Sequence, residues 1–204
     1  MKYTGERVIP KKMNPNNGML KEHIARYRFA AAFCRGRVLD IASGAGYGPQ
    51  LLLESAPIAA IAEIVGIDAS WEAVNYARWH YGSKNVKFYQ GDALDKRLCD
   101  TYGTFDTIVS FETIEHFAEA DVFLQVLKQL AKPHANIIIS TPFGKGRGKP
   151  CGDPYHVWQY TPAEFSELLR FFPSVELYHQ HDTVIEPPQS NTRYWLGVAV
   201  CRTS

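Results

Sequence analysis

The sequence predicts an α/β fold in which a mostly parallel sheet is covered by helices on both faces. Seven apolar stretches of strand length recur along the chain, and most of them alternate with segments of helical pattern. A glycine-rich turn, Ser43 to Gly48, directly follows the first stretch and leads into a helical segment. The last two stretches are joined by a loop without a helix, so they are most simply antiparallel. We therefore expect a seven-stranded sheet with one strand reversed near the C-terminus.

Each element follows from the local pattern of apolar residues. The expected strands are 38–41, 62–68, 86–90, 105–110, 137–140, 174–183 and 194–201. The expected helices are 21–33, 49–54, 71–77, 120–130 and one that begins after residue 161. That last helix is indicated by Thr161 as a cap and by Pro162 at the first helical position.

Length and composition fit a single domain with a core of its own. The chain has 204 residues, a formal net charge of +1 and four scattered cysteines without a Cys-x-x-Cys pair. The near-neutral charge gives no reason to expect a nucleic acid or a membrane as partner. Because the cysteines are typical of reduced thiols and no apolar signal segment opens the chain, we expect a cytoplasmic protein.

The glycine turn and the acid before it indicate a class of ligand. A strand, a glycine turn and a helix together bring backbone N–H groups up to a nucleotide-like ligand. Gly44, Gly46 and Gly48 have the spacing G-x-G-x-G, which differs from the dinucleotide fingerprint G-x-G-x-x-G. Asp40 lies on the preceding strand, where a carboxylate accepts hydrogen bonds from an ammonium group but repels a pyrophosphate. The pattern favours a nucleoside that carries an amino acid.

Two further acids follow the next two strands. Asp68 ends the strand 62–68, and Asp92 follows the strand 86–90. Ligands of open α/β sheets bind at the carboxyl ends of the strands, where Asp68 can accept both hydroxyls of a ribose. Asp68 could instead cap the next helix, although Ser70 is available for that role. Asp92 could instead belong to a simple Gly-Asp turn.

With these residues in hand, the chain resembles the class I S-adenosylmethionine (SAM)-dependent methyltransferases. Residues 38–48, VLDIASGAGYG, are similar to the first motif of that family, and the resemblance runs over nearly the whole chain. The segments TGERVIP and EHIARYRFA resemble a bacterial subgroup that acts on small molecules. The resemblance implies a Rossmann-like three-layer sandwich, SAM as cofactor and S-adenosylhomocysteine as product.

The resemblance also divides the single domain, 1–204, into three parts. Residues 1–34 would form an arm and a lid helix, 35–141 the SAM-binding core, and 142–204 a substrate loop, a helix and the final antiparallel strands. In the family, the acid at Asp92 contacts the adenine amine. The expected cofactor-binding residues are Arg26, Tyr27, Asp40, Ala42, Ser43, Gly44, Gly46, Tyr47, Gly48, Asp68, Ala69, Gly91, Asp92, Ala93, Phe111 and Glu112.

Candidate catalytic residues lie in two loops. In the family, the loop after the fourth strand faces the substrate; here it carries Glu112, Glu115 and His116. A histidine is a suitable general base near neutral pH, and His156 in the loop after residue 141 is the better candidate. Alternatively, Glu115 and His116 only fix the loop. Because Cys151 with His156 is too sparse for zinc, we expect no metal site.

The predicted function is transfer of a methyl group from SAM to an oxygen, nitrogen or carbon nucleophile of a small-molecule acceptor, by a monomer or homodimer. One alternative is a SAM-binding protein without transferase activity, which the motif residues do not exclude because they are binding residues. Another is an NAD(P)-dependent oxidoreductase, against which the glycine spacing, Asp40 and the paired final strands argue. The cationic loop with Lys145, Arg147 and Lys149 is compatible with an anionic acceptor.

Overall fold

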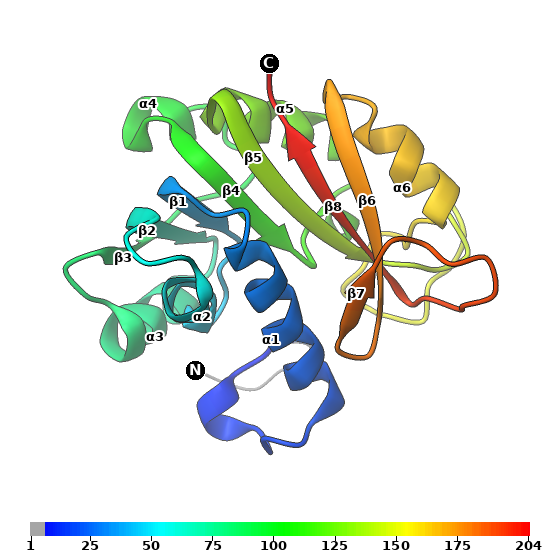
Figure 1. Cartoon of the computed structure of the whole chain (residues 1–204), viewed down its shortest axis with the longest axis horizontal. Helices are drawn as coiled ribbons and strands as arrows, with labels where there is room; N and C mark the ends of the chain where they lie inside the picture. The colour runs from blue at the N-terminus through cyan, green and yellow to red at the C-terminus, as the bar shows by residue number, and fades with distance from the viewer. Residues whose placement is uncertain (1–6) are drawn as a thin grey trace.

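The computed structural model describes residues 7–204 as one open, twisted sheet with helices on both faces (Figure 1). The strands are β1 (Gly36–Ile41), β2 (Ile61–Asp68), β3 (Val86–Gln90), β4 (Phe105–Phe111), β5 (Ala131–Pro142), β6 (Ser174–His181), β7 (Val184–Glu186) and β8 (Leu196–Arg202). The helices are α1 (Gly18–Ala31), α2 (Tyr47–Ser55), α3 (Trp71–Tyr81), α4 (Leu98–Tyr102), α5 (Ala120–Leu130) and α6 (Pro162–Leu169). Two short 3-10 turns are η1 (Pro10–Lys12) and η2 (Ile114–His116). The first residues of the expected arm, 1–6, lie outside the described part.

The strand order is β3-β2-β1-β4-β5-β8-β6-β7. Strands β1 to β5 pair in parallel, whereas β8 runs antiparallel to both of its neighbours, β5 and β6. The expected α/β class, with a mostly parallel sheet and a reversed strand inserted near its end, is confirmed. Because β8 runs antiparallel to β5, this sheet differs from the all-parallel sheets that consist only of strand–helix–strand crossovers.

The sheet has eight strands rather than the expected seven. The additional strand, β7, pairs antiparallel with residues 179–181 of β6 and so forms a hairpin at the edge of the sheet. Asp182 sits in the turn with a φ of 50°, a left-handed conformation that Asp tolerates better than most residues. With three residues, β7 is too short to show a period of two, and the sequence pattern predicted no strand there.

Alternate residues of the strands point to opposite faces of the sheet and pack into two apolar cores, one on each face. Leu39 and Ile41 of β1 belong to the core that α4, α5 and α6 cover. Val38 belongs to the opposite core, which α1, α2 and α3 cover. Figure 1 shows α1 in front of the sheet and beside α2. The three layers expected from the sequence are thus present.

Local capping fixes the helices that border the site. The Thr161 hydroxyl accepts the Glu164 N–H, and the Glu164 carboxylate accepts the Thr161 N–H, which makes a capping box at the start of α6. Ser70 caps α3 by accepting the N–H of Ala73. Both caps were predicted. Because Ser70 caps α3, Asp68 is not the N-cap residue of that helix. Within residues 7–204, the helices are too short and too polar to span a bilayer.

Candidate functional site

A cavity of about 610 Å³ opens at the carboxyl ends of β1 to β4. This volume lies in the range of small-molecule binding sites. Most of the residues predicted to bind a cofactor line it: Tyr27, Ala42, Ser43, Gly44, Tyr47, Asp68, Ala69, Gly91, Asp92, Ala93, Phe111 and Glu112. The same cavity is lined by His116 and His156, so one space holds both the predicted cofactor end and the predicted acceptor end.

Four predicted cofactor residues, Arg26, Asp40, Gly46 and Gly48, are not among the lining residues but lie behind the wall. Asp40 is 1% exposed and accepts a hydrogen bond from the Tyr27 hydroxyl at 3.2 Å. Burial raises the pKa of Asp40 to about 8; the Tyr27 hydrogen bond opposes this rise, and the charge of Asp68 adds to it. Asp40 therefore supports the wall through Tyr27.

Arg26 joins helix α1 to strand β6. Its guanidinium is 1% exposed, and Nη1 donates to Oε1 of Gln180 on β6 at 2.8 Å. The Gln180 amide in turn donates to the carbonyl of Glu22 at 3.1 Å. The position predicted as a cofactor contact thus has a packing role in the described structure, where it fixes α1 against β6.

Two of the three motif glycines are required by packing rather than by the cavity. A Cβ at Gly48 would lie 2.1 Å from the Tyr27 ring, and one at Gly46 would lie 2.4 Å from Cβ of Ala77. Gly44 differs, because it lines the cavity with a φ of +53° and a Cβ there would meet no atom of the described residues within 4 Å. Gly46 and Gly48 let α1 and α3 approach the turn, and Gly44 leaves the space above it open.

Asp68 organises the rim of the cavity. Its Oδ2 accepts the N–H of Gly44 and its Oδ1 accepts the N–H of Ser70, both at 2.8 Å. Its carbonyl accepts the N–H of Gly91 at 3.1 Å. The carboxylate is therefore held in place by the glycine turn and by the start of α3, while each oxygen keeps a further lone pair for a ligand hydroxyl. Asp92, on the next loop, is exposed on the cavity rim.

The loop after β4 places Glu112 on the cavity wall, at the end predicted to face the acceptor. Glu112 has a φ of 48°, which is unusual for a residue other than glycine and is often found at functional sites. The Ser140 hydroxyl at the end of β5 donates to Oε1 of Glu112 at 2.9 Å. Strands β4 and β5 thus hold this carboxylate at the cavity wall.

Glu115 is a residue whose importance the sequence analysis left open. It is fully buried, and its Oε2 accepts a hydrogen bond from the Thr141 hydroxyl at 3.0 Å. Within residues 7–204 its Oε1 accepts no hydrogen bond, and this oxygen lies 4.0 Å from Nε2 of His156. Burial raises the pKa of Glu115 well above its usual value, and the charge of Glu112 raises it further. The spacing Glu112-x-x-Glu115-His116 was visible in the sequence, but its approach to His156 was not.

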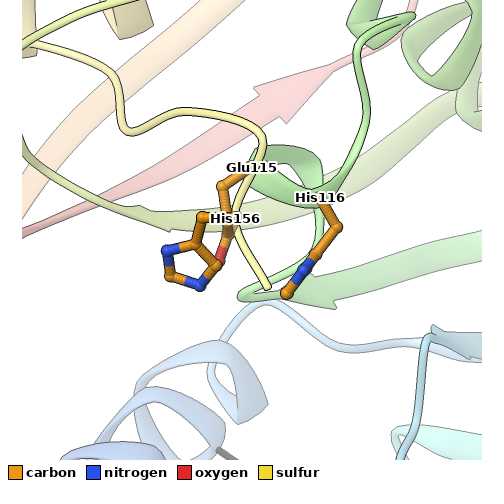
Figure 2. Close-up of side chains that lie close together, drawn as sticks. All are labelled: Glu115, His116 and His156. Carbon is orange, nitrogen blue, oxygen red and sulfur yellow. The ribbon is translucent and has the colours of Figure 1, made fainter. Parts of the chain in front are cut away.

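His116 and His156 come from different loops and meet beside Glu115 (Figure 2). Their rings are 4.9 Å apart, edge to face. Nδ1 of His116 lies 2.9 Å from the carbonyl oxygen of Tyr155, and the N–H of Val157 donates to the carbonyl of Glu115 at 2.9 Å. The loop that carries His156 is thus fastened on both sides of this residue.

The cationic residues of the loop after β5, Lys145, Arg147 and Lys149, do not line the cavity, whereas Asp153, Tyr155 and His156 of the same loop do. Its Arg147 donates its backbone N–H to Glu164 at 3.1 Å, and the guanidinium lies over the Trp158 ring. Other cavity residues were missed as site residues, among them His23, which bonds to the Tyr47 hydroxyl at 3.0 Å. Burial and the nearby Arg26 lower the pKa of His23. Its spacing of four residues from Tyr27 on α1 could have indicated its place.

An open sheet with one reversed inner strand, and a cavity above a glycine turn, defines an α/β domain of the class that binds nucleoside-like ligands. The chain belongs to the methyltransferase domain family, whose profile matches residues 35–168. The prediction of a class I SAM-dependent methyltransferase is thereby confirmed at the level of the family. This membership also counts against the oxidoreductase alternative.

Known relatives agree with this assignment. A probable S-adenosylmethionine-dependent methyltransferase of Mycolicibacterium smegmatis is 30% identical over 171 residues, which cover 81% of this chain and 62% of that protein. A ubiquinone biosynthesis O-methyltransferase of Mesorhizobium japonicum is 35% identical over 56% of this chain and 44% of its own length. The solved SAM-dependent methyltransferase of Archaeoglobus fulgidus has the same fold, with a TM-score of 0.64 at 17% identity, over 91% of this chain and 93% of that one. The chain thus spans about three fifths or less of the length of these curated relatives.

Proposed function

We propose that this protein transfers the methyl group of SAM to a nucleophile of a small-molecule acceptor. The observation that carries the proposal is the shared cavity, which has Asp68 and Asp92 on one part of its wall and Glu112, His116 and His156 on another. When a donor and an acceptor are held side by side in one cavity, the transfer becomes effectively unimolecular, and this can supply much of the rate.

The residues present fit SAM. Asp68, held by two backbone N–H groups, would accept the ribose hydroxyls, and Asp92 would accept the adenine amine. The open space over Gly44 would admit the amino-acid end, with Tyr27 in the cavity wall and Asp40 hydrogen-bonded to it from behind. SAM supplies a methyl group on a sulfonium, which is already an activated donor. The protein therefore contributes mainly by binding and orienting SAM and the acceptor and by excluding water, rather than by activating the methyl donor.

At the acceptor end, Glu112, His116 and His156 are proposed to orient the nucleophile and take its proton. All three line the cavity, and His156 has a side chain only 9% exposed. An imidazole in such a place is suited to accept a proton near neutral pH. The name of the Mesorhizobium relative adds support for an oxygen nucleophile among the oxygen, nitrogen and carbon nucleophiles considered.

The proposal extends to the location, oligomeric state and partners of the protein. We propose a cytoplasmic monomer or homodimer that acts on a small molecule, without nucleic acid or membrane as partner. The near-neutral net charge supports this view, because no large excess of either sign is available to attract a polyanion.

Calorimetric titration with SAM and with S-adenosylhomocysteine tests the cofactor. We expect micromolar binding of both compounds, followed by acceptor-dependent release of S-adenosylhomocysteine in a screen of hydroxylated small molecules. Binding without turnover on any acceptor would favour the SAM-binding protein that lacks transferase activity. Failure of both compounds to bind would overturn the proposal.

A further inference from the structure

Acidic side chains dominate the charge of the cavity wall. Among the described residues that line the cavity, the acids are Asp68, Asp92, Glu112 and Asp153, whereas Arg7 is the only side chain with a permanent positive charge. A cleft lined mainly by one sign of charge focuses the field inside it, because its walls have a low dielectric constant. The cavity should therefore favour cations over anions as ligands.

SAM offsets only part of this charge. Its sulfonium and its ammonium group are positive and its carboxylate is negative, so bound SAM would bring a single net positive charge. Among the described lining residues, the acids outnumber Arg7 four to one. A negative excess therefore remains for the acceptor to meet.

The cations that are compatible with an anionic acceptor lie outside the cavity. Lys145, Arg147 and Lys149 are exposed on the loop after β5 and do not line the cavity. Arg147 holds its guanidinium over the Trp158 ring, 5.0 Å from the ring centre. The same loop contributes Asp153 to the cavity wall, so the charge that it presents to an acceptor is negative.

Two of the acids, Glu112 and Asp153, come from the two loops that form the acceptor end. Oε1 of Glu112 accepts the Ser140 hydroxyl at 2.9 Å, and Oδ1 of Asp153 accepts the N–H of Tyr155 at 2.9 Å. Within residues 7–204, Oε2 of Glu112 and Oδ2 of Asp153 accept no hydrogen bond. Each carboxylate is thus oriented through one oxygen and keeps the other for a ligand.

A third carboxyl group, behind this wall, gives an independent sign of a missing positive partner. The Glu115 side chain is fully buried, and within the described residues its Oε1 accepts no hydrogen bond. This oxygen lies 4.0 Å from Nε2 of His156, a residue that lines the cavity (Figure 2). Buried polar atoms without a partner are costly, and they are usually satisfied by a donor or by a cation. A positive charge in the cavity would lower this cost.

The negative charge of Glu112 acts on other elements around the same end. Burial raises the pKa of Glu115 on η2 and of Glu22 on α1, and the charge of Glu112 is a further cause in both. Burial also raises the pKa of Tyr47 on α2, again with the charge of Glu112 among the further causes. A cation bound beside Glu112 would offset this repulsion at each of these groups.

We propose that the acceptor carries an ammonium group, which Glu112 and Asp153 bind at the acceptor end of the cavity. This inference rests on the proposed methyl transfer and narrows its acceptor to cationic small molecules. Phe117 and Tyr155 line the same cavity, and their ring faces can add cation–π attraction. An acceptor with a carboxylate or a phosphate in this place would instead be repelled.

Three phenols of nearly equal shape test the sign of the preferred charge. Tyramine carries an ammonium group, tyrosol a hydroxyl group and para-hydroxyphenylacetate a carboxylate. Calorimetric titrations of the protein, alone and saturated with S-adenosylhomocysteine, measure their affinities. At low ionic strength we expect tyramine to bind at least tenfold more tightly than para-hydroxyphenylacetate, with tyrosol between them. Added NaCl should reduce the difference, because salt screens the charges.

Neutral variants assign the preference to the two acids. Glu112→Gln and Asp153→Asn should each reduce the preference for tyramine over para-hydroxyphenylacetate at least threefold, with the affinity for tyrosol nearly unchanged. The amide oxygens can still accept the Ser140 hydroxyl and the N–H of Tyr155, so both loops should keep their structure. Asp121 is exposed on α5 and lies outside the cavity, so Asp121→Asn is the matched control and should keep the wild-type preference.

The outcome is independent of the cofactor proposal. Equal affinities for the three phenols, tighter binding of the anion or no binding of tyramine would overturn the cationic acceptor, even if SAM binds by calorimetry. A preference for tyramine that is unchanged in both variants would overturn the assignment to Glu112 and Asp153. Conversely, a preference for tyramine in a protein that binds neither SAM nor S-adenosylhomocysteine would leave the cationic ligand standing and remove the methyl transfer.

Discussion

The hydroxyl of Tyr27 on α1 donates a hydrogen bond to the carboxylate of Asp40 on β1, 3.2 Å away and shielded from solvent. This hydrogen bond connects α1 to β1, the strand that precedes the glycine turn. It also explains how a carboxyl group is accommodated in an apolar core, since one hydrogen bond offsets part of the cost of burying its charge.

The buried carboxyl of Asp40 should make the protein less stable as the pH rises. Its pKa is about 8 in the folded protein, above the ordinary value near 4, so the folded state binds the proton more tightly. The stabilisation is complete below about pH 4 and is lost as the pH rises to 8. Asp40→Asn should remove this dependence.

Urea unfolding of wild type and Asp40→Asn at pH 5 and pH 8 measures the effect. We expect the free energy of unfolding of the wild type to fall by several kcal/mol more than that of the variant between these values. Equal changes in both proteins would show that Asp40 titrates normally in the folded state.

Asp68→Ala should weaken SAM binding. The substitution removes the proposed acceptor of the ribose hydroxyls and two hydrogen bonds that hold Gly44 and Ser70. A loss of about 2 kcal/mol or more is expected from charge-assisted hydrogen bonds of this kind. Calorimetry measures it, with Asp95→Ala as control, because Asp95 bonds to Arg97 outside the cavity. Unchanged affinity in Asp68→Ala would refute the role.

Where the sequence pattern was long or chemically specific, its predictions agree with the structure. The strand 86–90, the helix 120–130 and the cap at Thr161 are found as expected. Asp68 lies at a strand end on the cavity, because parallel strands bring their carboxyl ends to one edge. These features depend on residues near one another in the chain.

Features that depend on distant residues were not predictable in this way. The hairpin strand β7 has too few residues for a period, and it is fixed by pairing with β6. The meeting of Glu115 with His156 depends on two loops 41 positions apart whose contact no local pattern encodes. The burial of Arg26 against Gln180 likewise requires α1 to lie on β6, which only the assembled sheet shows.

Glu112→Gln should lower methyl transfer while leaving the fold intact. The amide oxygen can still accept the Ser140 hydroxyl bond, so little stability should be lost. Burial is the main cause of the raised pKa of Glu115 and remains in the variant, but the contribution of the Glu112 charge is removed, so that pKa should fall. We expect turnover to fall at least tenfold once an acceptor is known, with the melting temperature within a few degrees of the wild type. Full activity would limit Glu112 to a structural role.

Alanine at two glycines of the same motif should destabilise the fold to different extents. In Gly48→Ala the added Cβ would lie 2.1 Å from the Tyr27 ring, so α1 must shift and the free energy of unfolding should fall by about 2–3 kcal/mol. In Gly44→Ala no atom lies within 4 Å of the Cβ, and the main cost is the left-handed backbone at φ +53°, about 1 kcal/mol.

The loss of SAM affinity should be larger in Gly44→Ala, although the loss of stability is larger in Gly48→Ala. The methyl group of Gly44→Ala projects into the space proposed for SAM, so its affinity by calorimetry should fall more than that of folded Gly48→Ala. This comparison separates two reasons for a glycine in one motif: Gly48 admits a neighbouring helix, and Gly44 admits a ligand. Suppose instead that Gly44→Ala binds SAM as the wild type does and Gly48→Ala does not. The cofactor would then lie over the contact between Gly48 and Tyr27 of α1 rather than over Gly44.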